Sequence, residues 1–178
     1  MEKILETVGV GEVFKVADFE FIKFYDENGN TVAVAKDSWF DSVFGDNNNF
    51  SKSNILKKLK KDYLPRIEAA VGAENVVAHE VDLLSMDGSE KWGKMKTKIS
   101  LPTFDFYRKY VKIFDKHKLN AWWWLATPET TTDHISHDYW VSCVAPSGYL
   151  DDYGGNYSSN GVRPLLIFVS SISVSCEE

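Results

Sequence analysis

The amino-acid sequence predicts an α+β fold built as one domain. Strand-like segments lie toward both ends of the chain and two helix-like segments lie between them, so the elements do not alternate as they do in βαβ units. Of the 178 residues, 44% are apolar and 14% are aromatic, which is enough to build a hydrophobic core. Because no repeat or low-complexity linker divides the chain, we expect residues 1–178 to form a single domain.

The first strands are predicted near the N-terminus. Residues Glu12–Tyr25 alternate between apolar and polar types and are rich in aromatic side chains, which is typical of a strand or a hairpin. The turn residues Asn28 and Gly29 then lead into a second strand, Thr31–Ala35, so a β-hairpin is predicted. The following loop-like segment, 37–49, carries three aromatic residues that we expect to be buried anchors, namely Trp39, Phe40 and Phe44.

A first helix is predicted after Ser53, whose side chain suits an N-cap. Its apolar residues share one helical face, and its lysines share the other: Ile55, Leu56, Leu59 and Tyr63 against Lys57, Lys58, Lys60 and Lys61. We interpret the lysines as a solvated helix face in preference to an anion or nucleic-acid site. Pro65 is expected to disturb this helix.

A second helix is predicted after Pro102 and Thr103. The aromatic stripe along it indicates a buried face in preference to a cofactor site, and it consists of Phe104, Tyr107, Val111 and Phe114. The apolar run 76–84 fits more than one element type, and 97–101 is strand-like. Further strands are predicted at Trp122–Leu125, Tyr139–Val144, Gly148–Tyr153 and Val162–Val169.

Composition bounds the possible functions. A formal net charge of −6 argues against nucleic acid as the main partner, and no apolar run reaches the length of a membrane span. The N-terminal residues lack the pattern of a secretory signal, so we expect a chain of the cytoplasm or of a phage virion. Two cysteines are too few for a disulfide framework, and the simplest reading is one buried thiol, Cys143, and one near the tail, Cys176. No motif for a cofactor is present, and we expect none.

Two motifs near the C-terminus carry a family resemblance. Trp123, Trp124, Leu125, Thr127 and Pro128 match a WWLR-S/T-P strand motif, with Ala126 in place of its arginine; Gly161, Val162, Arg163 and Pro164 match a closing GVRPA-type motif. With the upstream segment SLPTFDFYRKY, the sequence resembles C-type-lectin-like domains of phages and gut bacteria, including the variable proteins of diversity-generating retroelements.

The resemblance implies two helices packed on small antiparallel sheets, followed by a long, loop-rich β region. It also implies a structural frame, consisting of Trp122, Trp123, Trp124, Gly161, Arg163 and Pro164. As the only basic residue after Lys118, Arg163 is expected to bind a carboxylate or backbone carbonyls and to hold the terminal loops together.

Between the two motifs lies a polar stretch, residues 129–160, which we call the displayed segment. It contains no Lys, Arg, Gln or Met, and only Glu129 and Trp140 depart from the residues that adenine-directed diversification of Asn codons yields. Tyr, Ser and Asn are also common in antibody-like binding surfaces. The candidate ligand contacts are its exposed-type residues: Thr131, Asp133, His134, His137, Asp138, Tyr149, Asp151, Asp152, Tyr153, Asn156 and Tyr157.

Metal sites are less well supported by the sequence. His134 and His137 lie between Asp133 and Asp138, but no third, distant ligand for a transition metal is apparent. Asp151 and Asp152 could join a calcium site, but the calcium-binding triplets of sugar-binding lectins are absent. We therefore expect no metal site.

Three functions follow from these patterns. The favoured one is a binding module whose displayed segment recognises a protein or glycan, and diversification of this segment by a retroelement is part of that hypothesis. The second is a structural or accessory phage protein that assembles into an oligomer. The least favoured is an enzyme similar to formylglycine-generating proteins, which would require both Cys143 and Cys176.

Overall fold

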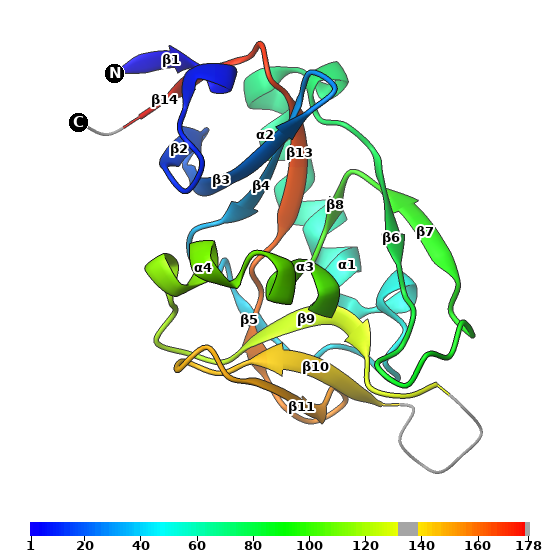
Figure 1. Cartoon of the computed structure of the whole chain (residues 1–178). Helices are drawn as coiled ribbons and strands as arrows, with labels where there is room; N and C mark the ends of the chain where they lie inside the picture. Colours follow the sequence, from blue (N-terminus) through cyan, green and yellow to red (C-terminus); the bar gives the residue numbers. More distant parts are fainter. Residues whose placement is uncertain (132–138, 177–178) are drawn as a thin grey trace.

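The computed structural model describes residues 1–131 and 139–176, and its elements form an α+β fold (Figure 1). The largest sheet has the order β1-β14-β2-β3-β4-β13-β8, with the bounds Glu2–Ile4, Ser173–Ser175, Val13–Val16, Phe19–Glu27, Asn30–Ala35, Leu165–Val169 and Ile99–Ser100. The second sheet has the order β11-β10-β9-β12-β5, with the bounds Leu150–Gly154, Trp140–Val144, Trp123–Pro128, Asn160–Gly161 and Asp41–Ser42. A third sheet pairs β6 (His79–Asp82) with β7 (Lys94–Thr97).

The predicted N-terminal hairpins are confirmed. β2, β3 and β4 pair in sequence order, and the turn between β3 and β4 places Asn28 at φ 51° and Gly29 at φ 76°. These values lie in the left-handed region, which Asn and Gly tolerate better than other residues. Of the three expected anchors, Phe44 is fully buried, whereas Trp39 and Phe40 are only partly buried and stack on Tyr63.

The first predicted helix is confirmed but is not uniformly α-helical. α1 (Asn54–Lys58) begins at Ser53, whose hydroxyl accepts a hydrogen bond from the Leu56 N–H at 3.0 Å. A π-helical turn, Leu59–Tyr63, joins α1 to α2 (Leu64–Val71). This wider turn allows the helix to continue past Pro65, which has no N–H to donate. Single 3₁₀ turns occur at Leu5–Thr7, Phe50–Lys52, Ala73–Asn75 and Asp115–His117.

The second predicted helix is divided into two short ones. α3 (Phe104–Lys109) starts at the N-cap Thr103, and α4 (Val111–Phe114) follows after a break at Tyr110, where φ is −112° and ψ is 22°. The Tyr110 ring stacks on Tyr25 of β3, with centroids 5.4 Å apart. Across the described ranges, no helix is both long enough and apolar enough to cross a bilayer.

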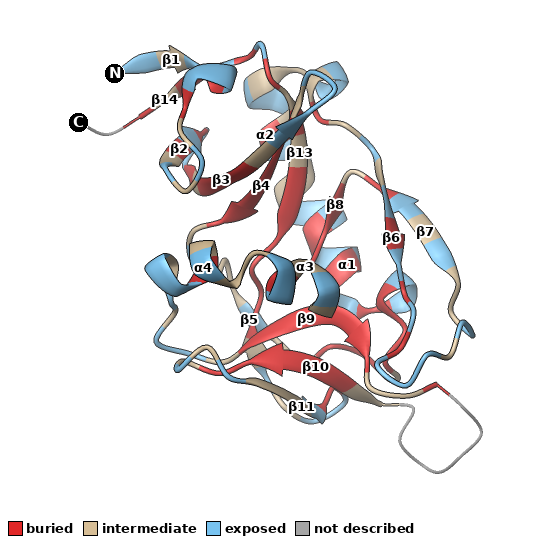
Figure 2. Cartoon of the chain, in the orientation of Figure 1, coloured by how far each residue is buried: buried red, intermediate tan, exposed pale blue. Residues whose placement is uncertain are grey.

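The strand β9 lies between two hydrophobic cores. Successive side chains of a strand point to opposite faces, so Trp124 enters one core, with Phe44 and Phe168, while Trp123 enters the other, with Phe114. Figure 2 shows that β9, β10 and β13 are largely buried. Both faces of β9 are therefore packed against a core, which fixes the position of the strands that pair with it.

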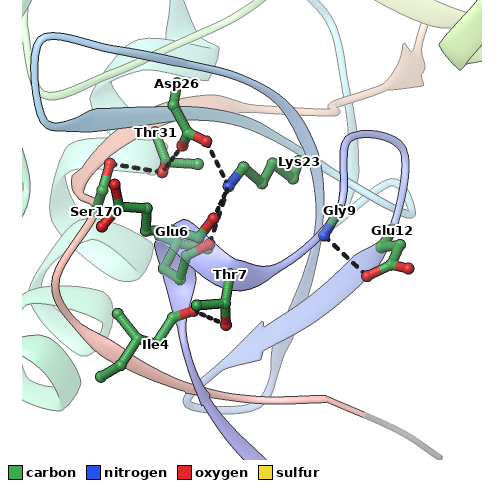
Figure 3. Close-up of polar contacts among 10 residues, drawn as sticks. Ile4, Glu6, Thr7, Gly9, Glu12, Lys23, Asp26, Thr31 and Ser170 are labelled. Carbon is green, nitrogen blue, oxygen red and sulfur yellow. Dashed lines mark hydrogen bonds and ion pairs between the residues drawn. The ribbon is translucent and has the colours of Figure 1, made fainter.

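The N-terminal turn is fastened to the large sheet by a buried lysine (Figure 3). Lys23, whose side chain is 1% exposed, donates from Nζ to the carbonyls of Leu5 and Glu6, each at 3.0 Å, and pairs with Asp26 at 2.6 Å. Thr31 bridges Asp26 and Ser170 through its hydroxyl. These contacts join the start of the chain, the β3–β4 hairpin and the segment before β14.

Candidate binding surface

The residues of the resemblance motifs form a largely buried scaffold beneath the displayed segment. Trp123, Trp124, Gly161, Arg163 and Pro164 are buried, and Trp122 is half-buried. The Trp124 indole donates from Nε1 to the Ser42 carbonyl at 2.8 Å, which satisfies its polar atom inside the core. The motifs therefore contribute to packing.

Arg163 binds backbone carbonyls, as the sequence predicts. Its Nε donates to the Ala35 carbonyl at 2.7 Å, and a terminal nitrogen donates to the His117 carbonyl at 3.1 Å. The guanidinium also lies over the rings of Phe114 and Trp123, at 5.3 and 5.2 Å from their centroids. Burial lowers the pKa of Arg163 to about 10, which leaves it charged at neutral pH. Through these contacts with two rings and two carbonyls, the Arg163 guanidinium links β4, the α4 region and the start of β13.

Asn48 links Thr130 and Trp140, which lie on either side of residues 132–138. This fully buried amide donates from Nδ2 to the carbonyls of Thr130 and Trp140, at 2.7 and 3.0 Å. Its Oδ1 accepts a hydrogen bond from Trp92 Nε1 at 2.9 Å. Neither Asn48 nor Trp92 was singled out from the sequence; the run of asparagines at 47–49 in a loop is the only signal that could have drawn attention to Asn48.

Thr131 was predicted to be an exposed ligand contact, but its side chain is buried. It is 1% exposed, and its hydroxyl donates to Ser89 Oγ at 2.5 Å. The neighbouring Thr130 donates to Asp87, and hydrogen bonds from Ser85 and Thr130 hold the pKa of Asp87 below its ordinary value. Thr131 therefore anchors the displayed segment. Asp133, His134, His137 and Asp138 lie outside the described residues.

The edge strand β11 carries three of the remaining candidates. Asp151 and Tyr153 share one face of this strand, whereas Asp152 shares the opposite face with Leu150. Tyr149 directly precedes the strand. Tyr149 is 64% exposed, and the partly covered Tyr153 packs edge-on against Trp122, with centroids 5.0 Å apart. Because the two aspartates point to opposite faces, they cannot both ligate one calcium ion through their side chains.

Tyr157 lies directly over the end of β11. A side-chain carbon added at Gly154 would come within 2.2 Å of the Tyr157 ring, so the ring occupies the space that a side chain would take. The ring is 64% exposed on its other side, and Asn156 beside it is exposed. Gly155 fixes this turn by donating to the Tyr139 carbonyl and accepting from the Phe44 N–H, both at 2.7 Å. Tyr149 and Tyr157 thus stand exposed just before and just after a well-anchored edge strand.

The two thiols are free and buried. Cys143 lies within β10, and burial, with a smaller effect of Asp151 and Asp152, raises the pKa of its thiol far above the ordinary value. Cys176, near the tail, is 9% exposed and exchanges backbone hydrogen bonds with Met1, so this second thiol is buried as well. Within residues 1–131 and 139–176, no three His, Cys, Asp or Glu side chains gather as a metal site would require.

Comparison with protein-family models, with curated proteins and with solved structures finds no match to this chain.

Proposed function

We propose that this chain is a binding module that recognises a protein or glycan through the surface formed by Tyr149, Asp151, Tyr153, Asn156 and Tyr157. The observation that carries the proposal is the 64% exposure of both Tyr149 and Tyr157, which flank the edge strand β11 on its buried scaffold. Tyrosine rings provide a large amphipathic contact area at low entropic cost. A rigid support spares the ordering cost that a flexible loop would pay on binding.

The proposed architecture is C-type-lectin-like, with residues 129–160 as the displayed segment. Three features support it: the buried tryptophans of β9, the pinning role of Arg163, and antiparallel sheets flanked by two short helical regions. Diversification of this segment by a retroelement remains part of the proposal. A nearby reverse-transcriptase gene with a near-copy of the 3′ coding end, differing at adenines, would test it.

The enzyme alternative is less well supported by the chemistry of the thiols. A thiol attacks as its thiolate, and the buried Cys143, with its raised pKa, is a poor nucleophile. The alternative of an oligomeric accessory phage protein draws on the edge position of β11, which leaves one side of that strand free of a partner strand within the described residues.

The experiment screens the purified chain against a glycan array and a displayed library of bacterial surface domains. Any bound ligand is then measured with the triple variant Tyr149→Ala/Asp151→Ala/Tyr157→Ala and with a control, Ile4→Ala/Val10→Ala, which also removes exposed apolar side chains. We expect the triple variant alone to weaken binding at least about tenfold, with a melting temperature within about 3 °C of the parent.

Retained binding with a lowered melting temperature would contradict the proposal, as would the absence of any ligand in both collections. If the parent chain forms a concentration-dependent oligomer and the triple variant does not, the accessory-protein alternative would be favoured instead.

A further inference from the structure

The hairpin of β6 and β7 connects the large sheet with the second sheet (Figure 1). At its base, Val76 bridges Phe168 of β13, and the Val77 N–H donates to the Ile167 carbonyl at 2.8 Å. Beyond that point β6 pairs with β7 and, within the described residues, with no other strand. At the far end of the hairpin, residues 84–92 form a turn beside the end of β9, and we call this turn the hairpin tip. The hairpin is therefore attached at both of its ends.

The hairpin tip is bonded to the residues where β9 ends and the displayed segment begins. The Met86 N–H donates to the Pro128 carbonyl at 2.9 Å, so the two backbones are in direct contact. Two residues further along, the Thr130 hydroxyl donates to Asp87 Oδ2 at 2.5 Å. Because Asp87 accepts as a carboxylate, this hydrogen bond is charge-assisted and stronger than one between neutral groups. Backbone and side-chain bonds of the tip therefore hold the same short stretch.

The hairpin tip is itself a closed turn, built around the hydroxyl of Ser85. Ser85 is 4% exposed, donates to Asp87 and accepts from the Ser89 N–H at 2.8 Å. Gly88 has a φ of 86°, a left-handed value that lets the chain reverse its direction. The turn presents Ser89 Oγ to Thr131, whose hydroxyl donates to it. These internal bonds therefore fix the positions of the two side chains that accept from the displayed segment.

A second connection leads from the hairpin tip to the tyrosine surface. Trp92, at the end of the tip, donates to Asn48, and Asn48 donates to the Trp140 carbonyl. Trp140 lies opposite Gly154 in the ladder between β10 and β11, and the ring of Tyr157 covers Gly154. A continuous series of contacts therefore runs from the tip to Tyr157.

The two ends of the hairpin differ in how firmly they are held. Val81 and Leu83, on the body side of the tip, are 4% and 0% exposed and belong to the hydrophobic core. At the tip, Asp87 and Gly88 are exposed, so the contacts of the tip lie next to water. Hydrogen bonds at such places open at a lower free energy than the packed core does. The tip can therefore separate from the displayed segment while the rest of the hairpin stays on the core.

We propose that the β6–β7 hairpin is a strap whose tip holds the start of the displayed segment in the conformation that binds a target, and that this tip opens separately from the rest of the fold. The closed strap reduces the conformational freedom that the segment would lose on binding. The effect on binding rests on the function proposed for the surface of Tyr149 and Tyr157, whereas the separate opening of the tip does not.

Amide hydrogen exchange at low urea concentrations, followed by NMR, tests whether the tip opens separately. The Glu129 N–H donates to the Trp140 carbonyl at 3.0 Å, and it should exchange together with the Met86 N–H. Both rates should depend little on urea, because a small opening exposes little surface. The Ala35 N–H, in β4, should exchange more slowly and with the urea dependence of global unfolding. Equal urea dependence at all three positions would overturn the proposal.

The variant Asp87→Ala/Ser89→Ala removes the two side chains of the tip that accept from the displayed segment. In this variant the Glu129 N–H should exchange at least about tenfold faster at low urea, because the open state is more populated. The control Glu90→Ala removes an exposed carboxylate of the same tip, and the rate should stay within about twofold of the parent. An unchanged rate in Asp87→Ala/Ser89→Ala would mean that these contacts do not hold the segment, and the strap would be rejected.

Binding provides the second measurement. A ligand obtained from the glycan array or the displayed library should bind Asp87→Ala/Ser89→Ala at least about fivefold more weakly and Glu90→Ala within about twofold, although neither variant changes a proposed contact residue. Equal affinity of the parent and the double variant would show that the strap does not serve binding. If the screens yield no ligand, the proposed function fails and the effect on binding fails with it, whereas the exchange rates still decide whether the tip opens as a strap.

Discussion

The Asn48 side chain is the hydrogen-bond acceptor of the Trp92 indole, with 2.9 Å between Trp92 Nε1 and Asn48 Oδ1. This contact orients the amide so that Nδ2 faces the carbonyls of Thr130 and Trp140. Asn48 and Trp92 thereby set the distance between Thr130 and Trp140 of the displayed segment.

Replacing Asn48 by Ala should lower the free energy of unfolding by about 2 to 4 kcal/mol, because the Thr130 carbonyl, the Trp140 carbonyl and the Trp92 indole N–H each lose a hydrogen bond to this buried amide. Urea unfolding followed by tryptophan fluorescence measures this change. Asn54→Ala, at an exposed position of α1, is the matched control and should change stability by less than about 0.5 kcal/mol. Equal effects of the two variants would contradict the anchoring role of Asn48.

Replacing Gly154 by Ala should displace the Tyr157 ring without unfolding the protein. The added carbon would meet the ring at 2.2 Å, but the ring is largely exposed and can swing outward, so we expect a loss of stability below about 1 kcal/mol. In NMR spectra, the ring-current shift of the residue 154 α-proton should disappear, as it should in Tyr157→Ala. The control is Gly45→Ala, whose nearest contact would be an ordinary 3.4 Å. An unchanged shift in Gly154→Ala would mean that the ring does not lie over residue 154.

Replacing Arg163 by Met or by Lys should lower the free energy of unfolding. Arg163→Met leaves the carbonyls of Ala35 and His117 without their donor, and we expect a loss of about 2 to 4 kcal/mol in the free energy of unfolding. Arg163→Lys keeps the charge but cannot bind two separated carbonyls in the plane between two rings, so it should recover less than half of that loss. Thermal and urea unfolding give both values. Full recovery by Lys would show that charge alone matters there.

The ion pair between the buried Lys23 and Asp26 should contribute more than an exposed pair. Lys23→Met removes three polar contacts in the interior and should cost about 2 to 4 kcal/mol, discounted because Asp26 is 37% exposed. Lys36→Met breaks a comparable pair with Glu20, in which both side chains are at least 25% exposed, and should cost less than about 1 kcal/mol. Similar costs in urea unfolding would argue against a fastening role for Lys23.

His79 should make stability depend on pH. Burial lowers the pKa of its imidazole below 6.5, with the Val77 backbone opposing the shift, so the unfolded chain takes up a proton before the folded one. Its contribution is then complete above pH 6.5 and is lost as the pH falls toward the folded pKa, with a slope of at most about 1.4 kcal/mol per pH unit. His79→Gln cannot titrate, and the other histidines cancel in the difference between the two proteins. Parallel stability profiles between pH 7.5 and 5 would contradict this prediction.

Local patterns predicted the elements whose cause is local. The β3–β4 turn follows from Asn28 and Gly29, and α1 begins where Ser53 offers a cap. In both cases neighbouring residues determine the preference. Arg163 was predicted to bind a carboxylate or backbone carbonyls because a lone cation among apolar residues needs acceptors, and the acceptors are carbonyls.

Features that depend on distant contacts did not appear in the pattern. The helical period runs unbroken through Tyr110, yet the helix is interrupted there, where the ring stacks on Tyr25. Thr131 has the side chain of an exposed loop residue but is buried against Ser89. The bonds of Asn48 span 82 and 92 residues of sequence, and no local signal could reveal them.

The pairing of β1 with β14 brings both ends of the chain out at one point, beside the large sheet and away from β11 (Figure 1). A chain tied at a single point can be spliced into a loop of a carrier protein without pulling its own ends apart. In such a fusion β11 would lie on the side of the domain away from the carrier. The molecule therefore has the geometry of an insertable domain.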